Sequence, residues 1–259
     1  MGTSPNPSSA LMWFFIITTI FFIAKYKSPD KSTMLSGVYI LLLVVGEFFV
    51  NLSLTDAMCG EKQWGTAFSI TLVPWVIIFG LLKLMLNLFP GWKRPFSNTF
   101  GYGVALMSGL TSLVQQIFKS KGVGTTPGSM NQALGYIYRD QSLLINEIGP
   151  EQEDFENFWT TMSGAIKTGV NQDKTDKDSL YNKLYNKIRL KDITSEYVWY
   201  MLTGALVTSI SYNYLVNIGC KHSAKEMIVR RNDYNKKVKE EEEKKKAQDK
   251  HKVIYTSSQ

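Results

Sequence analysis

The chain has 259 residues, and its 29 Lys and Arg outnumber its 22 Asp and Glu, which gives a formal net charge of +7. Only two cysteines, Cys59 and Cys220, are present, too few for a disulfide scaffold or a cysteine-based zinc cluster. The two histidines, His222 and His251, lie in a basic tail, which excludes most histidine-centred catalysis and most histidine metal sites. We therefore expect neither an enzyme nor a protein that holds a metal or another cofactor.

Four apolar stretches predict membrane-spanning helices, because a bilayer needs about 20 such residues. They cover residues 10–26, 34–54, 66–89 and 197–218. A cleaved signal peptide is the alternative for the first stretch, but signal peptides carry basic residues before the apolar run. Here residues 2–12 are uncharged and the lysines follow the run, so we expect a retained helix.

A further stretch, residues 100–118, is also uncharged but contains three glycines and two glutamines. Gly101, Ala105 and Gly109 recur every four residues, and small residues in such a stripe let helices pack closely within a membrane. We therefore expect a fifth span here, packed through these three residues. An interfacial or re-entrant helix is the alternative, which would leave four spans.

The distribution of basic residues favours five spans. Apart from the long loop at residues 119–196, five spans would place the lysines that follow the first span, Lys93, Arg94 and the twelve Lys and Arg of the tail on one side of the membrane, and only Lys62 on the other. Short loops rich in Lys and Arg stay on the cytosolic side. We therefore expect an outer or lumenal N-terminus and a cytosolic C-terminus.

Two polar regions complete the predicted all-α architecture, in which residues 1–118 hold the N-terminal helices of a polytopic transmembrane protein with four to five spans. Residues 119–196 repeat apolar residues at threes and fours in three segments, which predicts a small helical loop domain. That domain is either a compact structural unit or a docking surface. Residues 219–259 pair Glu with Lys at helical spacing and predict a charged helical tail, in which Arg230 and Arg231 are candidate docking residues. The tail lacks the aromatic platforms of single-strand binding proteins, so nucleic acid is not an expected partner.

Glu47 and Lys83 are the charged residues well inside the four strongest spans, and such residues are functional candidates. The rise of about 1.5 Å per residue places them near opposite faces of a hydrocarbon core about 30 Å thick, too far apart for a direct salt bridge. Lys83 can extend to the membrane surface. Glu47 is either a satisfied structural group at a helix interface or part of a proton or ion path.

The segment between the third and fourth predicted spans reads FPGWKRPFSNTFGYG at residues 89–103. Its Pro-Gly pair forces a sharp turn, its tryptophan suits the headgroup level, and its Lys and Arg can face lipid phosphates. The segment is either a rigid hairpin turn or a binding edge for lipid or a partner protein. The candidate binding residues are Pro90, Gly91, Trp92, Lys93, Arg94, Pro95, Phe96 and Asn98.

This segment, together with ALGYIYRDQSLLINEI at residues 133–148, resembles membrane proteins of large icosahedral double-stranded DNA viruses, the algal and amoebal giant-virus group. The resemblance covers residues 75–150. It implies a component of the virion's internal membrane, derived from a host membrane of the endoplasmic-reticulum type during assembly. It also implies contacts with minor capsid proteins or a part in shaping the membrane.

We therefore expect a structural membrane protein of a virion, which anchors the internal membrane to capsid-associated proteins or aids virus assembly. Its partners would be the lipid bilayer and other virion proteins, and homo-oligomerisation is left open. The alternative is a small ion channel or transporter that uses Glu47 and the Gly-rich stretch at residues 100–118.

Overall fold

The computed structural model describes residues 8–119, 128–217, 220 and 224–250. Within these ranges the chain forms helices and no strand, with one isolated antiparallel bridge between Phe118 and Ile166. The predicted all-α class is therefore confirmed.

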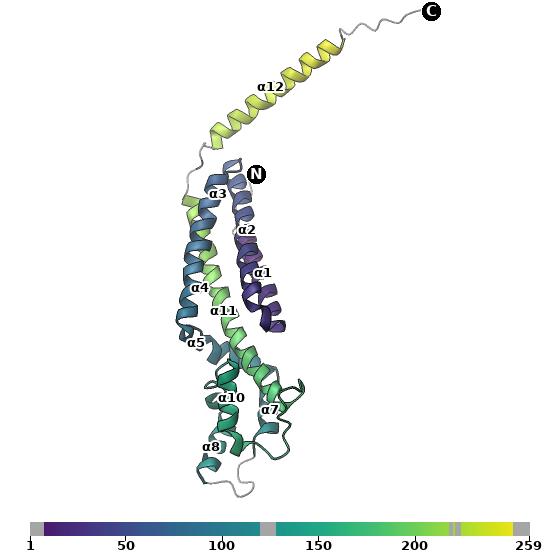
Figure 1. Ribbon diagram of the computed structural model, residues 1–259. Coiled ribbons are helices and arrows are strands. Elements are labelled where there is room, and N and C mark those ends of the chain that lie inside the picture. The colour runs from purple at the N-terminus through teal and green to yellow at the C-terminus, as the bar shows by residue number, and fades with distance from the viewer. Residues whose placement is uncertain (1–7, 120–127, 218–219, 221–223, 251–259) are drawn as a thin grey trace, which may run out of the picture.

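The helices differ greatly in length (Figure 1). Two of the shorter ones, η2 and η4, are π-helical. In chain order the elements are α1 (Ser8–Lys27), η1 (Pro29–Lys31), α2 (Ser32–Cys59), α3 (Trp64–Thr71), η2 (Leu72–Ile78), α4 (Phe79–Leu88), η3 (Pro90–Lys93), α5 (Arg94–Phe96), η4 (Ser97–Gly101), α6 (Tyr102–Met107), α7 (Leu110–Ile117), α8 (Gly128–Arg139), α9 (Ser142–Ile145), α10 (Gln152–Thr161), η5 (Ser163–Ala165), α11 (Leu180–Asn217) and α12 (Ala224–Lys250).

Four long helical segments pack side by side as a bundle: α1, α2, the continuous run α3–η2–α4, and the second half of α11 (Figure 1). Glycines allow close contacts within it, because Phe14 of α1 lies directly against Gly204 of α11, and Trp13 lies against Gly46 of α2. Aromatic residues dominate the core of this bundle and include Phe14, Phe21, Phe22, Tyr39, Trp75, Phe79, Trp199 and Tyr200.

Three helices of the described chain are long and apolar enough to cross a membrane: Ser8–Lys27, Pro29–Cys59 and Trp64–Leu88. Large apolar side chains such as Ile16 and Leu41 remain exposed on their outer faces, where lipid would meet them. Three is fewer than the predicted four to five, and the two missing spans have different explanations.

Residues 100–118 form no single helix long enough to cross a membrane, so the expected fifth span is not among the three apolar helices, and the alternative of an interfacial helix remains. The chain turns at Ser108 and at Gly109, whose φ of 95° is left-handed, so α6 and α7 are separate short helices. The apolar side chains of α7 lie on one face, while Gln115 and Gln116 are exposed. That is the pattern of an amphipathic surface helix. Because α7 contains no charged residue, its sequence resembles part of a membrane span.

The segment instead belongs to a helical domain at the other end of the molecule from the disulfide described below (Figure 1). Its core joins α6 and α7 to α8, α9, α10 and the first half of α11. The domain therefore begins soon after α4, earlier than the predicted residue 119. Its core residues include Ala105, Leu110, Val114, Phe118, Leu134, Ile145, Phe155, Trp159, Tyr181, Leu184 and Ile188.

Residues 197–217 of the last predicted span form the second half of α11 rather than a helix of their own, and residue 218 lies outside the described residues. This single helix of 38 residues buries Leu184 and Ile188 in the domain and Tyr200 and Val207 in the bundle. Its second half is rich in Ser, Thr, Tyr and Asn, which explains why it is not among the three strongly apolar helices. It rigidly links the domain to the bundle.

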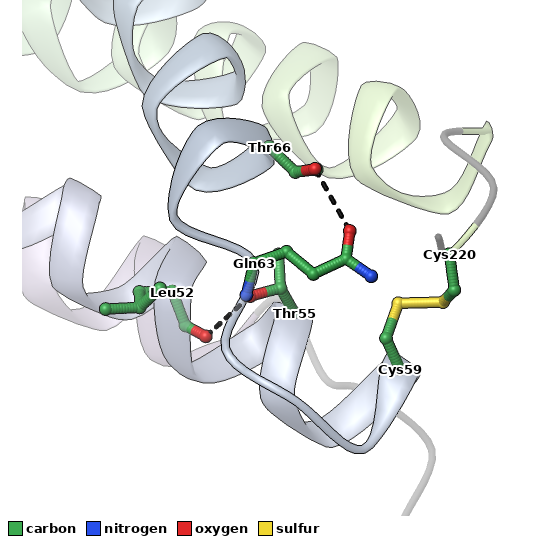
Figure 2. The surroundings of a disulfide bond; sticks show 6 residues. All are labelled: Leu52, Thr55, Cys59, Gln63, Thr66 and Cys220. Carbon is green, nitrogen blue, oxygen red and sulfur yellow. Dashed lines mark hydrogen bonds between the residues drawn. A yellow bond between two sulfur atoms is a disulfide. The ribbon is translucent and has the colours of Figure 1, made fainter. Parts of the chain in front are cut away.

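A disulfide joins Cys59, the last residue of α2, to Cys220, which follows α11 (Figure 2). The two cysteines are 161 positions apart in sequence. Two cysteines are indeed too few for a scaffold, but their number and spacing did not predict this single cross-link. It closes the end of the bundle that is remote from the helical domain, which we call the disulfide end.

This disulfide corrects the predicted sidedness. Because residues 100–118 do not cross, α2 and α11 both run from the domain toward the disulfide end, and the loop after Cys59 and the chain at Cys220 share one side. The start of α1 lies at this end as well, since Lys25 near its other end meets Glu196. In this fold the start of α1 and the end of α11 thus lie at one end of the bundle, whereas the expected five spans would place them at opposite ends.

Candidate functional site: a pocket where the domain meets the bundle

The predicted interfacial turn forms the connection between α4 and the helical domain. Phe89 and Trp92 stack with their ring centroids 5.9 Å apart, and both rings are about half exposed. Exposed aromatic rings of this kind suit the headgroup level of a membrane. Pro90 opens η3, where its missing N–H has no helical partner to lose.

Two ion pairs fix the turn and α1 to α11. Lys93 Nζ donates to Asp192 Oδ2 at 2.9 Å, and Lys25 Nζ donates to Glu196 Oε2 at 2.6 Å. Asp192 and Glu196 are one helical turn apart. All four side chains are partly exposed, so the pairs mainly fix geometry rather than add much stability. They define a charged belt at the boundary between bundle and domain.

A pocket of about 450 Å³ opens beside this belt. Six residues between Pro90 and Asn98 line one side, and seven residues between Asn146 and Asp154 line another. Ile188, Lys191 and Asp192 of α11 complete the lining. Five of the eight residues predicted as a binding edge are in the lining, namely Pro90, Gly91, Lys93, Arg94 and Asn98.

The other three predicted residues lie outside the lining. Trp92 and Pro95 are exposed, and Phe96 packs against the aromatic core of the bundle. The turn therefore presents two different surfaces, an aromatic edge toward the expected membrane surface and a polar edge toward the pocket.

Lys191 is the most deeply buried charged residue of the pocket, with 3% of its surface exposed. Its Nζ donates to the Ile145 carbonyl oxygen at 2.9 Å and to Asn146 Oδ1 at 3.3 Å. Burial lowers the pKa of Lys191 to about 8, and Arg94 acts in the same direction, while Asp192 and Glu147 oppose the shift. The lysine ties the segment after α9 to α11 and so shapes the pocket.

The remaining charges of the pocket are free to meet a ligand. Arg94, Glu147, Glu151 and Asp154 are exposed, and the side chains of these four make no hydrogen bond or ion pair to any described residue. Both signs of charge thus line one concave surface, which suits a polar segment of another protein or a zwitterionic headgroup. Among the described residues, no group of three or more potential metal ligands occurs.

A change of Lys191 to methionine tests the burial of its amine. The folded chain binds the lysine proton with a pKa of about 8, against 10.5 in the exposed group, so the unfolded state holds more protons between these values. The free energy of unfolding therefore rises with pH from about 8 to 10, by at most about 3 kcal/mol. Lys191→Met should remove that rise, as measured by chemical denaturation across this pH range, and an unchanged slope would contradict the assignment.

The other predicted site residues lie elsewhere. Glu47 is fully buried in the bundle, and Lys83 is partly exposed with Glu196 and Lys25 as the charges that act on it. The structure thus does not bring Glu47 and Lys83 together. The Gly-rich stretch that the channel alternative combined with Glu47 lies in the helical domain, away from the stretch of α2 that carries Glu47.

The predicted small-residue stripe is only partly continuous. Gly101 lies directly against the backbone of Lys191, and Ala105 is fully buried. Gly109 ends the helix and has open space where a Cβ would be. In the tail, Arg231 is exposed on α12, while the Arg230 side chain lies outside the described residues.

Lys191, Asn146 and Asp192 were missed in the sequence. A signal for Lys191 was present, because it follows Leu184 and Ile188 on the same apolar face of the helix, at spacings of seven and three. A charged residue on a buried face needs a partner. That partner, the end of α9, could not be known before the tertiary fold.

Comparisons of this chain with protein-family models, with curated proteins and with solved structures found no match.

Proposed function

We propose that this chain is a structural membrane protein of a large icosahedral DNA virus, which anchors the internal virion membrane to capsid-associated proteins. The three apolar helices and the second half of α11 would hold it in the bilayer. The helical domain would stand on one side of the membrane, and α12 on the other.

The observation that carries this proposal is the meeting of two segments at one pocket. Residues 89–103 and residues 133–148 bear the resemblance to giant-virus membrane proteins, and both contribute to the lining. A docking role for the pocket accounts for its free charges, because an anchoring protein must recognise a partner beside the membrane surface. The aromatic pair Phe89 and Trp92 would hold the pocket at headgroup level.

The experiment uses virus particles that contain the full chain with a photo-crosslinking residue at one position. A crosslinker in place of Asn98, in the pocket lining, should capture a capsid-associated protein in intact particles. A crosslinker in place of Leu143, which is exposed on the same domain but outside the lining, should capture much less. Detergent should release the protein together with the lipid.

Two results would contradict the proposal. Absence of the chain from purified particles would remove the virion role. Equal capture from Asn98 and Leu143 would remove the pocket as the docking site.

A further inference from the structure

The inner face of α2 carries a line of polar side chains. Glu47, Asn51 and Thr55 are spaced by four residues, so they lie one above another on the helix. Glu47 is 0% exposed, Asn51 2% and Thr55 1%. A buried polar line is costly in a bundle whose outer surface is apolar, so its presence needs a reason.

Most of this line is joined to neighbouring helices by hydrogen bonds. Asn51 Nδ2 donates to Thr71 Oγ1 of α3 at 3.0 Å and to Ser211 Oγ of α11 at 3.5 Å. Ser211 Oγ in turn donates to the Ile70 carbonyl oxygen at 3.2 Å. We use the term polar stripe for Glu47, Asn51, Thr55, Gln63, Thr71 and Ser211.

The polar stripe reaches the surface at the disulfide end. Thr55 Oγ1 accepts the Gln63 backbone N–H at 3.2 Å, and Gln63 Oε1 accepts from Thr66 Oγ1 at 3.0 Å beside the disulfide (Figure 2). Gln63 and Thr66 also line an open pocket of about 530 Å³. Gln63 Nε2 is buried and has no partner among the described residues. The stripe therefore opens to the surface at Gln63 and Thr66, and we call this opening the mouth of the stripe.

The other end of the polar stripe is closed. Beyond Glu47 the same face of α2 carries Leu43, fully buried, and then Tyr39, whose hydroxyl pairs with Thr18 at 3.0 Å. Phe21 stacks on Tyr39 with ring centroids 4.4 Å apart, and Phe22 and Tyr200 complete an aromatic layer between Glu47 and the charged belt. Among the described residues, the polar side chains that lead from Glu47 toward the surface are therefore those of the stripe.

Glu47 itself has no partner. Neither carboxyl oxygen makes a hydrogen bond to any described residue, although the side chain is fully buried. The described helix turns beside Glu47 present tryptophan rather than a cation. Trp13 of α1 lies against Gly46, the residue before Glu47 on α2. Trp75 of η2 follows Thr71 by one turn. An isolated carboxylate in such surroundings would cost far more than a neutral acid.

We propose that Glu47 is a proton-binding site inside the membrane, loaded and unloaded through the polar stripe from the disulfide end. The proton would come from hydronium at the mouth and return to water there, so no other reactant is needed. Waters bridging Asn51, Thr71 and Ser211 would carry it, since such groups offer the two to four partners that a buried water requires. This role goes beyond anchoring and rests only on the membrane location of the bundle.

Carbodiimide labelling tests the protonated state of Glu47. The full chain is placed in lipid nanodiscs, insertion is checked by flotation, and an apolar carbodiimide is added. The acid proton moves to a carbodiimide nitrogen while the carboxylate oxygen bonds to the central carbon, so only a protonated acid reacts. We expect mass spectrometry to find the adduct on Glu47, and Glu47→Gln to lack it. An inserted protein that stays unlabelled at Glu47 would overturn the proposal.

Infrared spectroscopy tests the route. The carbonyl band of the Glu47 acid should be absent in Glu47→Gln and should shift when the nanodiscs are transferred to D2O. Asn51→Leu should slow that shift at least tenfold. Ser53→Leu is the matched control, since Ser53 is exposed on the opposite face of α2 at nearly the same depth, and it should leave the rate unchanged. Equal rates in both variants would overturn the route through the stripe.

Discussion

Replacing Cys59 with serine is expected to lower the free energy of unfolding by up to about 5 kcal/mol. The Cys59–Cys220 disulfide closes a loop of 161 residues, and in the chain-entropy model a cross-link over such a length restricts the unfolded state by about that amount. Helices that persist in detergent or lipid after unfolding reduce the gain. The measured loss should therefore lie between about 2 and 5 kcal/mol.

Thermal unfolding of the purified protein in detergent measures this effect. Cys59→Ser, Cys220→Ser and the double variant should give the same loss, because any one of them removes the bond. A reductant should lower the midpoint of the unmodified protein and leave the variants unchanged. Identical midpoints with and without reductant would contradict the cross-link.

Cys59→Ser also tests which side of the membrane the disulfide end faces. In Cys59→Ser the thiol of Cys220 is free, and a membrane-impermeant maleimide should label it from the side that also exposes the loop after Cys59. Disulfides persist in oxidising compartments, so we expect this side to be lumenal or extracellular and the helical domain to face the cytosol. Labelling from the domain side would contradict that orientation.

The distribution of basic residues could not by itself predict on which side of the membrane the tail lies. Lys25 and Lys27 in the last turn of α1, together with Lys31, Lys93 and Arg94, lie at the domain end of the bundle and favour the cytosol. The basic tail follows the last helix, and the first helices usually dominate orientation. Whether the tail shares their side depends on an odd or even number of spans, and that number depended on residues 100–118.

Hydrophobic length predicted the three apolar helices because long apolar runs with at most one charged residue inside them have few other uses. It failed for residues 100–118 because two short amphipathic helices can be as free of charge as one long span. The left-handed Gly109 separates them, and nothing in the sequence distinguishes that glycine from one that packs within a helix. The predicted turn residues did reach a pocket, but its other walls come from segments that only the tertiary fold brings near.

Gly101→Ala is expected to destabilise the junction between domain and bundle, by about 1 to 3 kcal/mol. A Cβ at this position would collide with the backbone carbonyl oxygen of Lys191 on α11. A backbone atom within a 38-residue helix cannot rotate away as a side chain can, so η4 and α11 would have to separate. Separation would also disturb the bond between Lys191 and the end of α9.

Gly103→Ala is the matched control for this prediction. Gly103 lies in α6, two residues along the chain, and has no atom within 4 Å of an added Cβ. Alanine should stabilise a helix at such a position by about 0.5 to 1 kcal/mol. The two substitutions should therefore shift the thermal midpoint in opposite directions, and shifts of the same sign would contradict the close approach of η4 to α11.

Gly101→Ala and Gly103→Ala also distinguish anchoring of the protein in the membrane from docking of a partner at the pocket. Gly101→Ala should displace Lys191, which lines the pocket, while the three apolar helices, which lie in another part of the chain, keep their contacts with lipid. We expect this variant to enter membranes normally and to lose capture of a capsid-associated protein from a crosslinker at Asn98. Gly103→Ala should keep both. Loss of membrane insertion in Gly101→Ala would instead mean that the domain must fold before the bundle can enter the bilayer.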